Sequence, residues 1–144
     1  MGLVMRSLSD LRVGDEIPPL TKGPITRQLL VEWCAAENDY YPLHYDERVA
    51  AAMKLPGTPI QGTYKVALMG QAIQRWLAGR GVLNSLSARY RGLNLEGEQL
   101  TAHGRITRID TVSGCATLEM HISGDSGEST TDAVAVVTLQ RQSI

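Results

Sequence analysis

The stretch 62–78 constrains the fold more than any other part of this sequence. Gly62 and Thr63 open it, Gly79 and Gly81 end it, and its apolar residues cover most of a helix circumference: Val66, Ala67, Leu68, Met69, Ala72, Ile73, Trp76 and Leu77. A helix that is apolar on most sides must be buried on most sides. The rest of the chain therefore has to supply a cover for it.

Four later segments can provide that cover. Residues 86–90, 100–106, 116–122 and 133–139 alternate apolar and polar side chains. A period of two is typical of strands with one buried face. Turn-forming residues at Gly92, Asn94, Gly97 and in the run 124–127 separate the strands. One antiparallel sheet around one buried helix satisfies both patterns, so we predict an α+β fold in a single domain, 1–144.

The first half of the chain predicts the approach to this helix. Residues 13–23 contain two prolines and two glycines and indicate an extended arm. Thr26 is a good helix N-cap, and Asn38 tolerates the left-handed conformation that ends a helix. We expect 39–59 to be a long ordered loop with a short helical turn at 47–53.

Composition excludes several function classes. A net charge of −1 gives no field for nucleic acid or an anionic membrane. Cys34 and Cys115 form no metal or redox spacing, so a reduced, cytoplasmic setting is expected. Residues 1–11 lack the apolar run of a signal peptide. Residues 66–77 are too short and too polar to span a bilayer.

Asp39 and His44 are the strongest candidates for chemistry. They flank Pro42 in a loop that directly follows a helix, and a bend there would turn both side chains toward one point. A carboxylate beside an imidazole can hold and ionise one water. On spacing alone an alternative stands: Asp39 caps the loop and His44 bonds a backbone carbonyl. His103 and His121 fall in the polar phase of their strands and are expected at the surface.

The motif around this pair resembles the MaoC-like dehydratases, which include the R-specific enoyl-CoA hydratases. The family signature has Asp, any residue, Asn, Pro, an aliphatic residue and His; here the run 36–44 reads AENDYYPLH. The stretch PGTPIQGT at 56–63 resembles the proline-rich segment and the Gln-Gly pair that open the family's central helix. The run VGDE at 13–16 resembles the family's start. The resemblance covers nearly the whole chain and implies a hotdog fold.

Two residues depart from the family pattern. Asn38 replaces a Gly, and both residues accept positive φ. Tyr41 replaces an Asn that helps to fix the catalytic loop, and a tyrosine there implies a reshaped pocket, weak catalysis or catalysis shared with a partner chain.

The resemblance implies hydration and dehydration of a 2-enoyl-CoA or (3R)-3-hydroxyacyl-CoA thioester, with no metal or redox cofactor. Asp39 and His44 would bind the water, and the N–H of Gly62 would stabilise the oxyanion, because a helix N-terminus offers free N–H groups. Tyr41, Gln61 and Thr63 are expected near the substrate. Arg89 and Arg91 share a strand face that either holds the coenzyme A phosphates or is simply solvated.

Two other functions remain open at this stage. An acyl-CoA thioesterase on the same fold would direct the water to the carbonyl carbon. Alternatively, the chain is an acyl-binding, non-catalytic subunit of a heteromeric hydratase, which Tyr41 motivates. Because unpaired sheet edges favour association, we expect a homodimer or higher oligomer, or a heteromer.

Overall fold

The computed structural model describes residues 7–140. The expected domain limits at 1 and 144, and part of the segment 1–11, lie outside these residues. Its elements follow in chain order: η1 (Leu8–Asp10), β1 (Leu20–Lys22), α1 (Arg27–Glu37), η2 (Pro42–His44), α2 (Glu47–Ala52), α3 (Gly62–Leu77), β2 (Gly81–Tyr90), β3 (Leu100–Asp110), β4 (Cys115–Ser123) and β5 (Ser129–Leu139).

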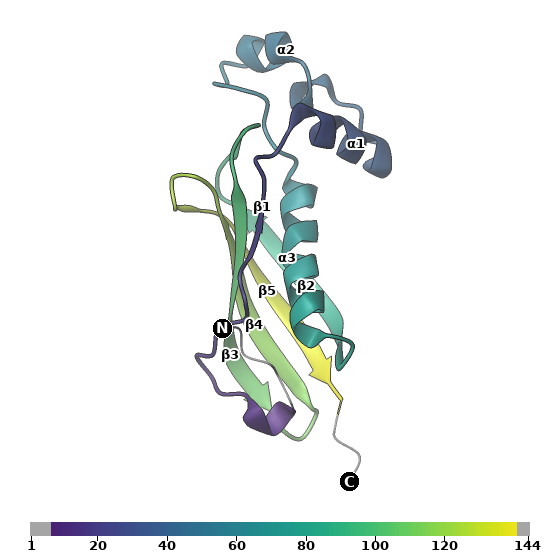
Figure 1. Cartoon of the computed structure of the whole chain (residues 1–144), viewed down its shortest axis with the longest axis vertical. Coiled ribbons are helices and arrows are strands. Elements are labelled where there is room, and N and C mark those ends of the chain that lie inside the picture. Colours follow the sequence, from purple (N-terminus) through teal and green to yellow (C-terminus); the bar gives the residue numbers. More distant parts are fainter. Residues whose placement is uncertain (1–6, 141–144) are drawn as a thin grey trace.

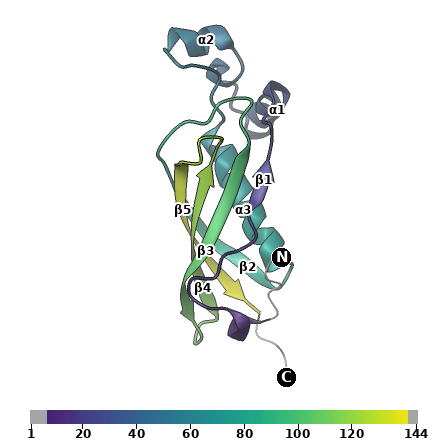
Figure 2. The same cartoon turned by 60° about the vertical axis from the view of Figure 1, so that its left-hand side comes forward.

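One antiparallel sheet carries the fold, with strand order β1-β3-β4-β5-β2. Helix α3 lies along one face of the sheet and contacts every strand (Figures 1 and 2). Apolar side chains of α3 meet those of β3, β4 and β5 in one core that includes Met69, Ile73, Leu77, Leu100, Leu118, Ile122 and Val137. The predicted arrangement of a sheet around a central helix is confirmed.

The helix is not covered all round. An open stripe of α3 carries Thr63, Ala67, Gln71, Gln74 and Arg75, all exposed. A single sheet reaches only one side of a helix, so the opposite side of α3 faces away from the sheet (Figure 1). The helix ends at Ala78, which adopts a left-handed conformation with φ 48°.

The strands differ from the prediction in number and in extent: β3 ends at Asp110 and β5 begins at Ser129, each four residues beyond the predicted limit. The sheet has five strands rather than four, because the extended arm pairs with β3 through β1 and through the bridge between Glu16 and Arg105. Strand β2 begins at Gly81, five residues before the predicted 86. A register shift between Leu83 and Ser85 interrupts the period of two there, which hides the first half of the strand.

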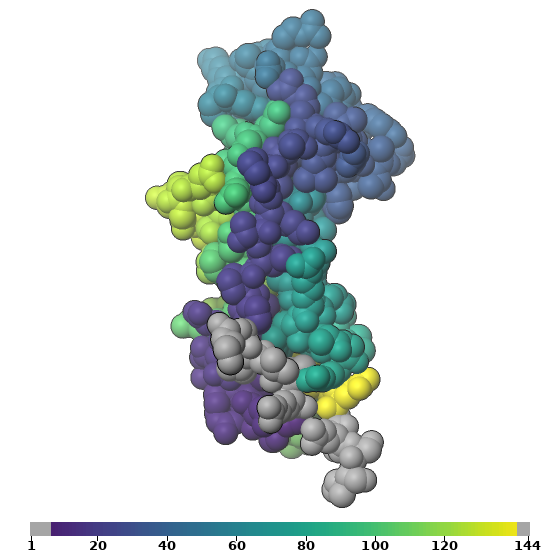
Figure 3. Space-filling model, viewed as in Figure 1, coloured from purple at the N-terminus to yellow at the C-terminus, as the bar shows by residue number. Residues whose placement is uncertain are grey.

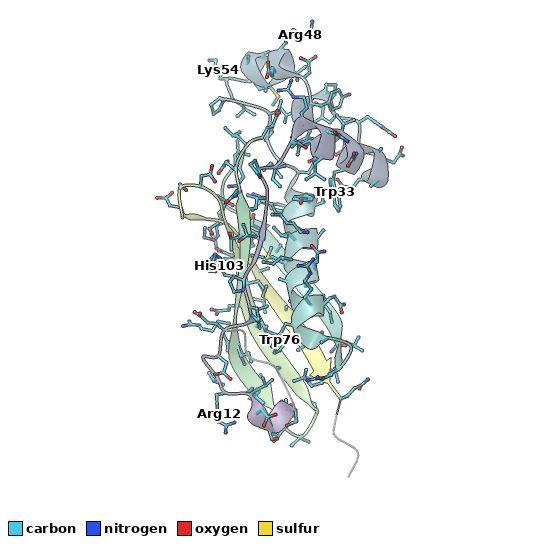
Figure 4. All side chains as sticks on the ribbon, in the orientation of Figure 1. Arg12, Trp33, Arg48, Lys54, Trp76 and His103 are labelled. Carbon is cyan, nitrogen blue, oxygen red and sulfur yellow. The ribbon has the colours of Figure 1, made fainter. Side chains whose placement is uncertain are left out.

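Helices α1 and α2 lie beyond one end of the sheet, past the start of α3 (Figure 1). We call residues 27–59 the helical lobe, and in the space-filling view it sits on the end of the sheet–helix body (Figure 3). Several polar contacts join the lobe to that body. Trp33 lies beside the start of α3 (Figure 4), and its Nε1 donates to Thr63 Oγ1 at 3.0 Å. Arg27 donates to Glu96.

Within residues 7–140, no helix combines the length and apolar character needed to cross a lipid bilayer.

Candidate active site

Helix α1 delivers Asp39 to one end of α3. Thr26 Oγ1 accepts from the Leu29 N–H at 3.1 Å and so caps the start of α1, as predicted. Asn38 ends it with φ 57°, also as predicted, and the reversal lets the Asp39 N–H donate to the Cys34 carbonyl at 2.9 Å. Asp39 Oδ1 then accepts from the Tyr41 N–H at 3.2 Å, which fixes the carboxylate in a local turn.

The 3-10 turn η2 delivers His44. Pro42 opens this turn, where its fixed φ suits a helical start. His44 Nδ1 lies 2.8 Å from the Pro59 carbonyl oxygen. A carbonyl can only accept, so the neutral ring carries its proton on Nδ1, and its Nε2 lone pair has no partner among residues 7–140. The alternative interpretation expected Asp39 to cap the loop and His44 to bond a backbone carbonyl, and both contacts are present. These contacts orient the two side chains and do not hide them.

The start of α3 supplies the third candidate. Gln61 precedes the helix and no side chain caps it. The first N–H groups of a helix have no intrahelical partner and carry its positive dipole end. Gly62 also faces the Tyr90 ring, because a Cβ at residue 62 would stand 2.6 Å from that ring. A side chain at residue 62 would therefore displace the exposed Tyr90 ring.

These three candidates share one pocket of about 300 Å³ at the junction of the helical lobe and α3. Its walls combine both parts of the molecule. The lobe contributes Glu37, Asp39, Leu43, His44 and Pro59. The body contributes Ile60 to Thr63 and Lys65 around the start of α3, Tyr90 at the end of β2, and Gly92 and Leu93 after it. The pocket thus brings together a carboxylate, an imidazole with a free nitrogen and an uncapped helix start.

Gln61 and Thr63, which the sequence placed near the substrate, both line this pocket. Gln61 is buried, and its Nε2 donates to the Leu30 carbonyl and to Cys34 Sγ, both at 3.1 Å. Gln61 Oε1 has no partner among the described residues. A buried acceptor that lines a pocket can take a hydrogen bond from a bound molecule.

Tyr41, Arg89 and Arg91 do not line this pocket. The Tyr41 ring packs edge-on against His44 at 6.3 Å between centroids, and its hydroxyl points to Met53 Sδ. Arg89 and Arg91 line a different pocket of about 640 Å³ on the sheet face turned away from α3. There Arg91 forms an ion pair with Asp132 at 2.8 Å.

Among the pocket residues that the sequence interpretation missed are Lys65 and Tyr90. Lys65 was read as part of an apolar helix, although it is a lysine three residues after Gly62. Tyr90 was expected on the buried face of its strand, but its side chain is exposed, and nothing in the sequence indicated that its ring would reach Gly62. Periodicity assigns a face to a residue and does not identify its neighbours across the fold.

Burial governs the electrostatics of the pocket. It raises the pKa of the Cys34 thiol next to Gln61, with the Asp39 and Glu37 charges acting in the same direction. It lowers the pKa of the Lys65 ammonium, which the charge of Glu98 partly offsets. Cys34 is therefore a neutral buried thiol and not a nucleophile. Across residues 7–140, no group of three or more His, Cys, Asp or Glu is placed to hold a metal ion.

Comparisons with known proteins agree with this architecture. The (R)-hydratase from A. caviae involved in PHA biosynthesis is 24% identical with a TM-score of 0.83, over 90% of this chain and 97% of that one. R-hydratase PhaJ1 from Pseudomonas aeruginosa is 17% identical with a TM-score of 0.84, over 94% and 86%. The ChsH1-ChsH2 complex from Mycobacterium tuberculosis gives 17% and 0.80, over 90% and 98%. These likenesses confirm the hotdog fold.

No curated protein matches the chain significantly. Residues 12–125, however, match the family described as "MaoC like domain". That match spans most of the chain, including the helical lobe, α3 and strands β2 to β4. The chain therefore belongs to the MaoC-like domain family.

Proposed function

We propose that the chain hydrates 2-enoyl-CoA thioesters to (3R)-3-hydroxyacyl-CoA thioesters and catalyses the reverse dehydration. The observation that supports this proposal is that Asp39, His44 and Gly62 line one pocket, while the contact of His44 Nδ1 with Pro59 leaves Nε2 available. Two of the similar structures are R-hydratases, which supports the R stereochemistry.

The proposed reaction uses these groups in order. His44 Nε2 takes a proton from a water that Asp39 also holds. The oxygen of that water bonds to C3, the C2=C3 π electrons move toward the thioester, and negative charge collects on the carbonyl oxygen. The N–H of Gly62 stabilises that oxyanion. The Asp39–His44 pair then returns the proton to C2, so one water has been added across the double bond.

The neighbours of the pair have supporting roles in this proposal. Gln61 Oε1 is free to accept from the water or from the substrate. The outward Arg89 and Arg91 would contact coenzyme A only if the cofactor portion of the substrate crossed to the other sheet face. We therefore propose Gln61 and Thr63, rather than the two arginines, as the substrate contacts of this chain.

The test is loss of the conjugated absorbance of crotonyl-CoA and of longer enoyl-CoA thioesters. Asp39→Asn keeps an oxygen to accept from the Tyr41 N–H, and His44→Ala removes the free nitrogen. Each should lower kcat/KM by about 10²–10⁴-fold. His121→Ala, on the outer sheet face, is the matched control and should retain activity. Full activity in both pocket variants would refute the assignment, and release of free thiol would identify a thioesterase.

A non-catalytic role within a heteromer is the second candidate. Tyr41 replaces the expected Asn, and similar structures include the heteromeric ChsH1-ChsH2 and HadBC complexes of Mycobacterium tuberculosis. Binding of acyl-CoA without turnover by the purified chain, and turnover after addition of a partner chain, would favour this role.

We also propose that the chain associates through β2. This strand forms one edge of the sheet and is ten residues long, whereas β1 at the other edge has three. A long unpaired edge favours pairing with another strand. A monomer by light scattering at micromolar concentration would contradict the association.

We also propose the reducing cytoplasm as the setting of this protein, because Cys34 and Cys115 are both free thiols.

A further inference from the structure

Lys65 is a buried lysine that the proposed reaction does not use. It is 2% exposed and lines the pocket. It lies three residues after Gly62, and residues at that spacing share one face of a helix. Helix side chains lean toward the N-terminus, so the Lys65 side chain leans toward the oxyanion end of the pocket.

The Lys65 ammonium is held by uncharged acceptors. Nζ donates to the Gly92 carbonyl at 3.1 Å and to Asn94 Oδ1 at 3.3 Å. Among the described residues no carboxylate forms an ion pair with it. Glu98 is reached only through Asn94, whose Nδ2 donates to Glu98 Oε1 at 3.2 Å. The positive charge is therefore buried without a directly paired anion.

This placement is unfavourable for folding alone. A buried charge without a paired anion loses its hydration, and a cation close to a helix N-terminus opposes the helix dipole. An unbranched apolar side chain would fill the same position without either cost. Residues that lower stability concentrate at functional sites. Here the Lys65 charge and the positive end of the α3 dipole both make the electrostatic potential of the pocket more positive.

The contacts of Lys65 also brace the start of α3. Asn94 receives Lys65 on its side chain, while its carbonyl accepts from the Ile60 N–H at 2.8 Å. Thr130 Oγ1 donates to the same Asn94 Oδ1 and fixes the side chain from the sheet. Lys65 and Asn94 thus clamp the chain just before Gly62 to the loop that follows β2.

We propose that Lys65 is a positioning residue whose charge, through the clamp at Asn94, favours negative charge on a thioester oxygen bound at Gly62. The inference rests on the proposed function, because it assigns the oxyanion to the start of α3. Asp39, Glu37 and His44 face the same pocket from the helical lobe, Tyr90 faces it from β2, and Glu98 lies behind Asn94.

The test uses acetoacetyl-CoA as a probe that needs no turnover. Loss of a C2 proton to the Asp39–His44 pair or to solvent converts the probe to an enolate, which absorbs in the near ultraviolet. The wild-type protein should favour the bound enolate, and Lys65→Met should reduce its affinity by about 10- to 100-fold. Lys65→Arg, which keeps the charge, should lose less. Lys54→Met, in the exposed part of the lobe, is the matched control and should behave as wild type.

Unfolding measurements separate this role from a structural one. The Lys65→Met variant should be at least as resistant to urea as the wild type, because Asn94 Oδ1 retains the Thr130 donor. If that variant does not fold, Lys65→Gln provides the neutral side chain with a donor for Gly92. An unchanged enolate band in the neutral variant, or no enolate band in the wild type, would overturn the proposal.

The parallel crotonyl-CoA assay keeps the two proposals apart. If the wild type hydrates crotonyl-CoA and Lys65→Met forms the enolate equally well, only the role of Lys65 fails. If the wild type hydrates no enoyl thioester but binds a Lys65-dependent enolate, the role of Lys65 stands and the hydratase assignment fails.

Discussion

His44 Nδ1 and the Pro59 carbonyl oxygen, 2.8 Å apart, tie the loop that carries the imidazole to the segment that leads into α3. The bond holds the ring and determines which nitrogen is free. Pro59 itself is buried and precedes Gly62 by three residues. One hydrogen bond therefore sets both the chemistry of His44 and its place relative to the helix start.

The two nitrogens of His44 should be separable by substitution. Asn places an amide nitrogen close to where Nδ1 lies, so His44→Asn can keep the Pro59 contact while losing the base. We expect wild-type unfolding in urea and a loss of about 10²-fold or more in kcat/KM. The measurement is the crotonyl-CoA assay beside an equilibrium unfolding curve. An active His44→Asn variant would show that Nε2 is not the base.

A methyl group at residue 62 should be costly in two distinct ways. In Gly62→Ala the Cβ would stand 2.6 Å from the Tyr90 ring, so this exposed ring must turn aside, at a cost of roughly 0.5–1 kcal/mol of unfolding free energy. The methyl group would also obstruct the approach to the N–H, and we expect at least a tenfold fall in kcat/KM. Adding Tyr90→Ala should recover the stability but not the activity. Recovery of both would mean that the ring, and not the N–H, matters.

Tyr41 should matter through its ring rather than its hydroxyl. The hydroxyl reaches only Met53 Sδ, at 3.4 Å, whereas the ring packs edge-on against His44. We expect Tyr41→Phe to stay within about twofold of wild-type kcat. Tyr41→Ala should lose about 3- to 10-fold, because an edge-to-face contact contributes roughly 0.5–1.5 kcal/mol. Steady-state kinetics on the three proteins measure the difference, and a large effect of Tyr41→Phe would contradict this reading.

Stability should fall in mild acid because of the histidine pair on the outer sheet face. His103 and His121 stack at 4.5 Å on paired strands, and burial, followed by the charge of His121, lowers the pKa of His103. The unfolded chain then binds a proton more readily than the folded one. This contribution is intact above the ordinary histidine pKa of about 6.5 and is lost as pH falls from there through the lowered folded value.

Urea unfolding at a series of pH values between neutral and mildly acidic conditions measures this loss. His103→Gln should reduce the dependence of the unfolding free energy on pH. Arg105→Gln changes a neighbour on the same strand and is a control that should leave this dependence unchanged. An unchanged pH dependence in His103→Gln would assign the effect to other groups.

The sequence predicted those parts of the fold that local chemistry determines. Thr26 caps α1 and Asn38 ends it because a hydroxyl and a left-handed residue act within a few positions. The alternating strands and the apolar helix were predicted for the same reason. The pairing of β1 with β3 and the early start of β2 were not predicted, since a three-residue pairing has almost no periodicity and a bulge breaks the pattern.

The candidate site was predictable to a similar extent. The family motif indicated Asp39, His44 and Gly62, and these residues share a pocket. Arg89 and Arg91 were chosen as cations on a strand face, but alternation alone does not tell which face of the sheet a ligand meets. Lys65 and Tyr90 reach the pocket through contacts between distant segments, which only the folded chain reveals.

Because the helical lobe lies beyond the end of the sheet, the proposed catalytic groups are divided between two parts of the molecule that differ in how much apolar contact holds them together. The acid–base pair belongs to the lobe, which contributes only Leu30 and the partly buried Leu29 to the apolar core, whereas the amide at the start of α3 belongs to the body that supplies the rest of that core. Regions with few buried apolar contacts open at a lower free energy than the core does. Increasing denaturant should therefore abolish the proposed hydratase activity while the sheet still gives a native circular dichroism signal.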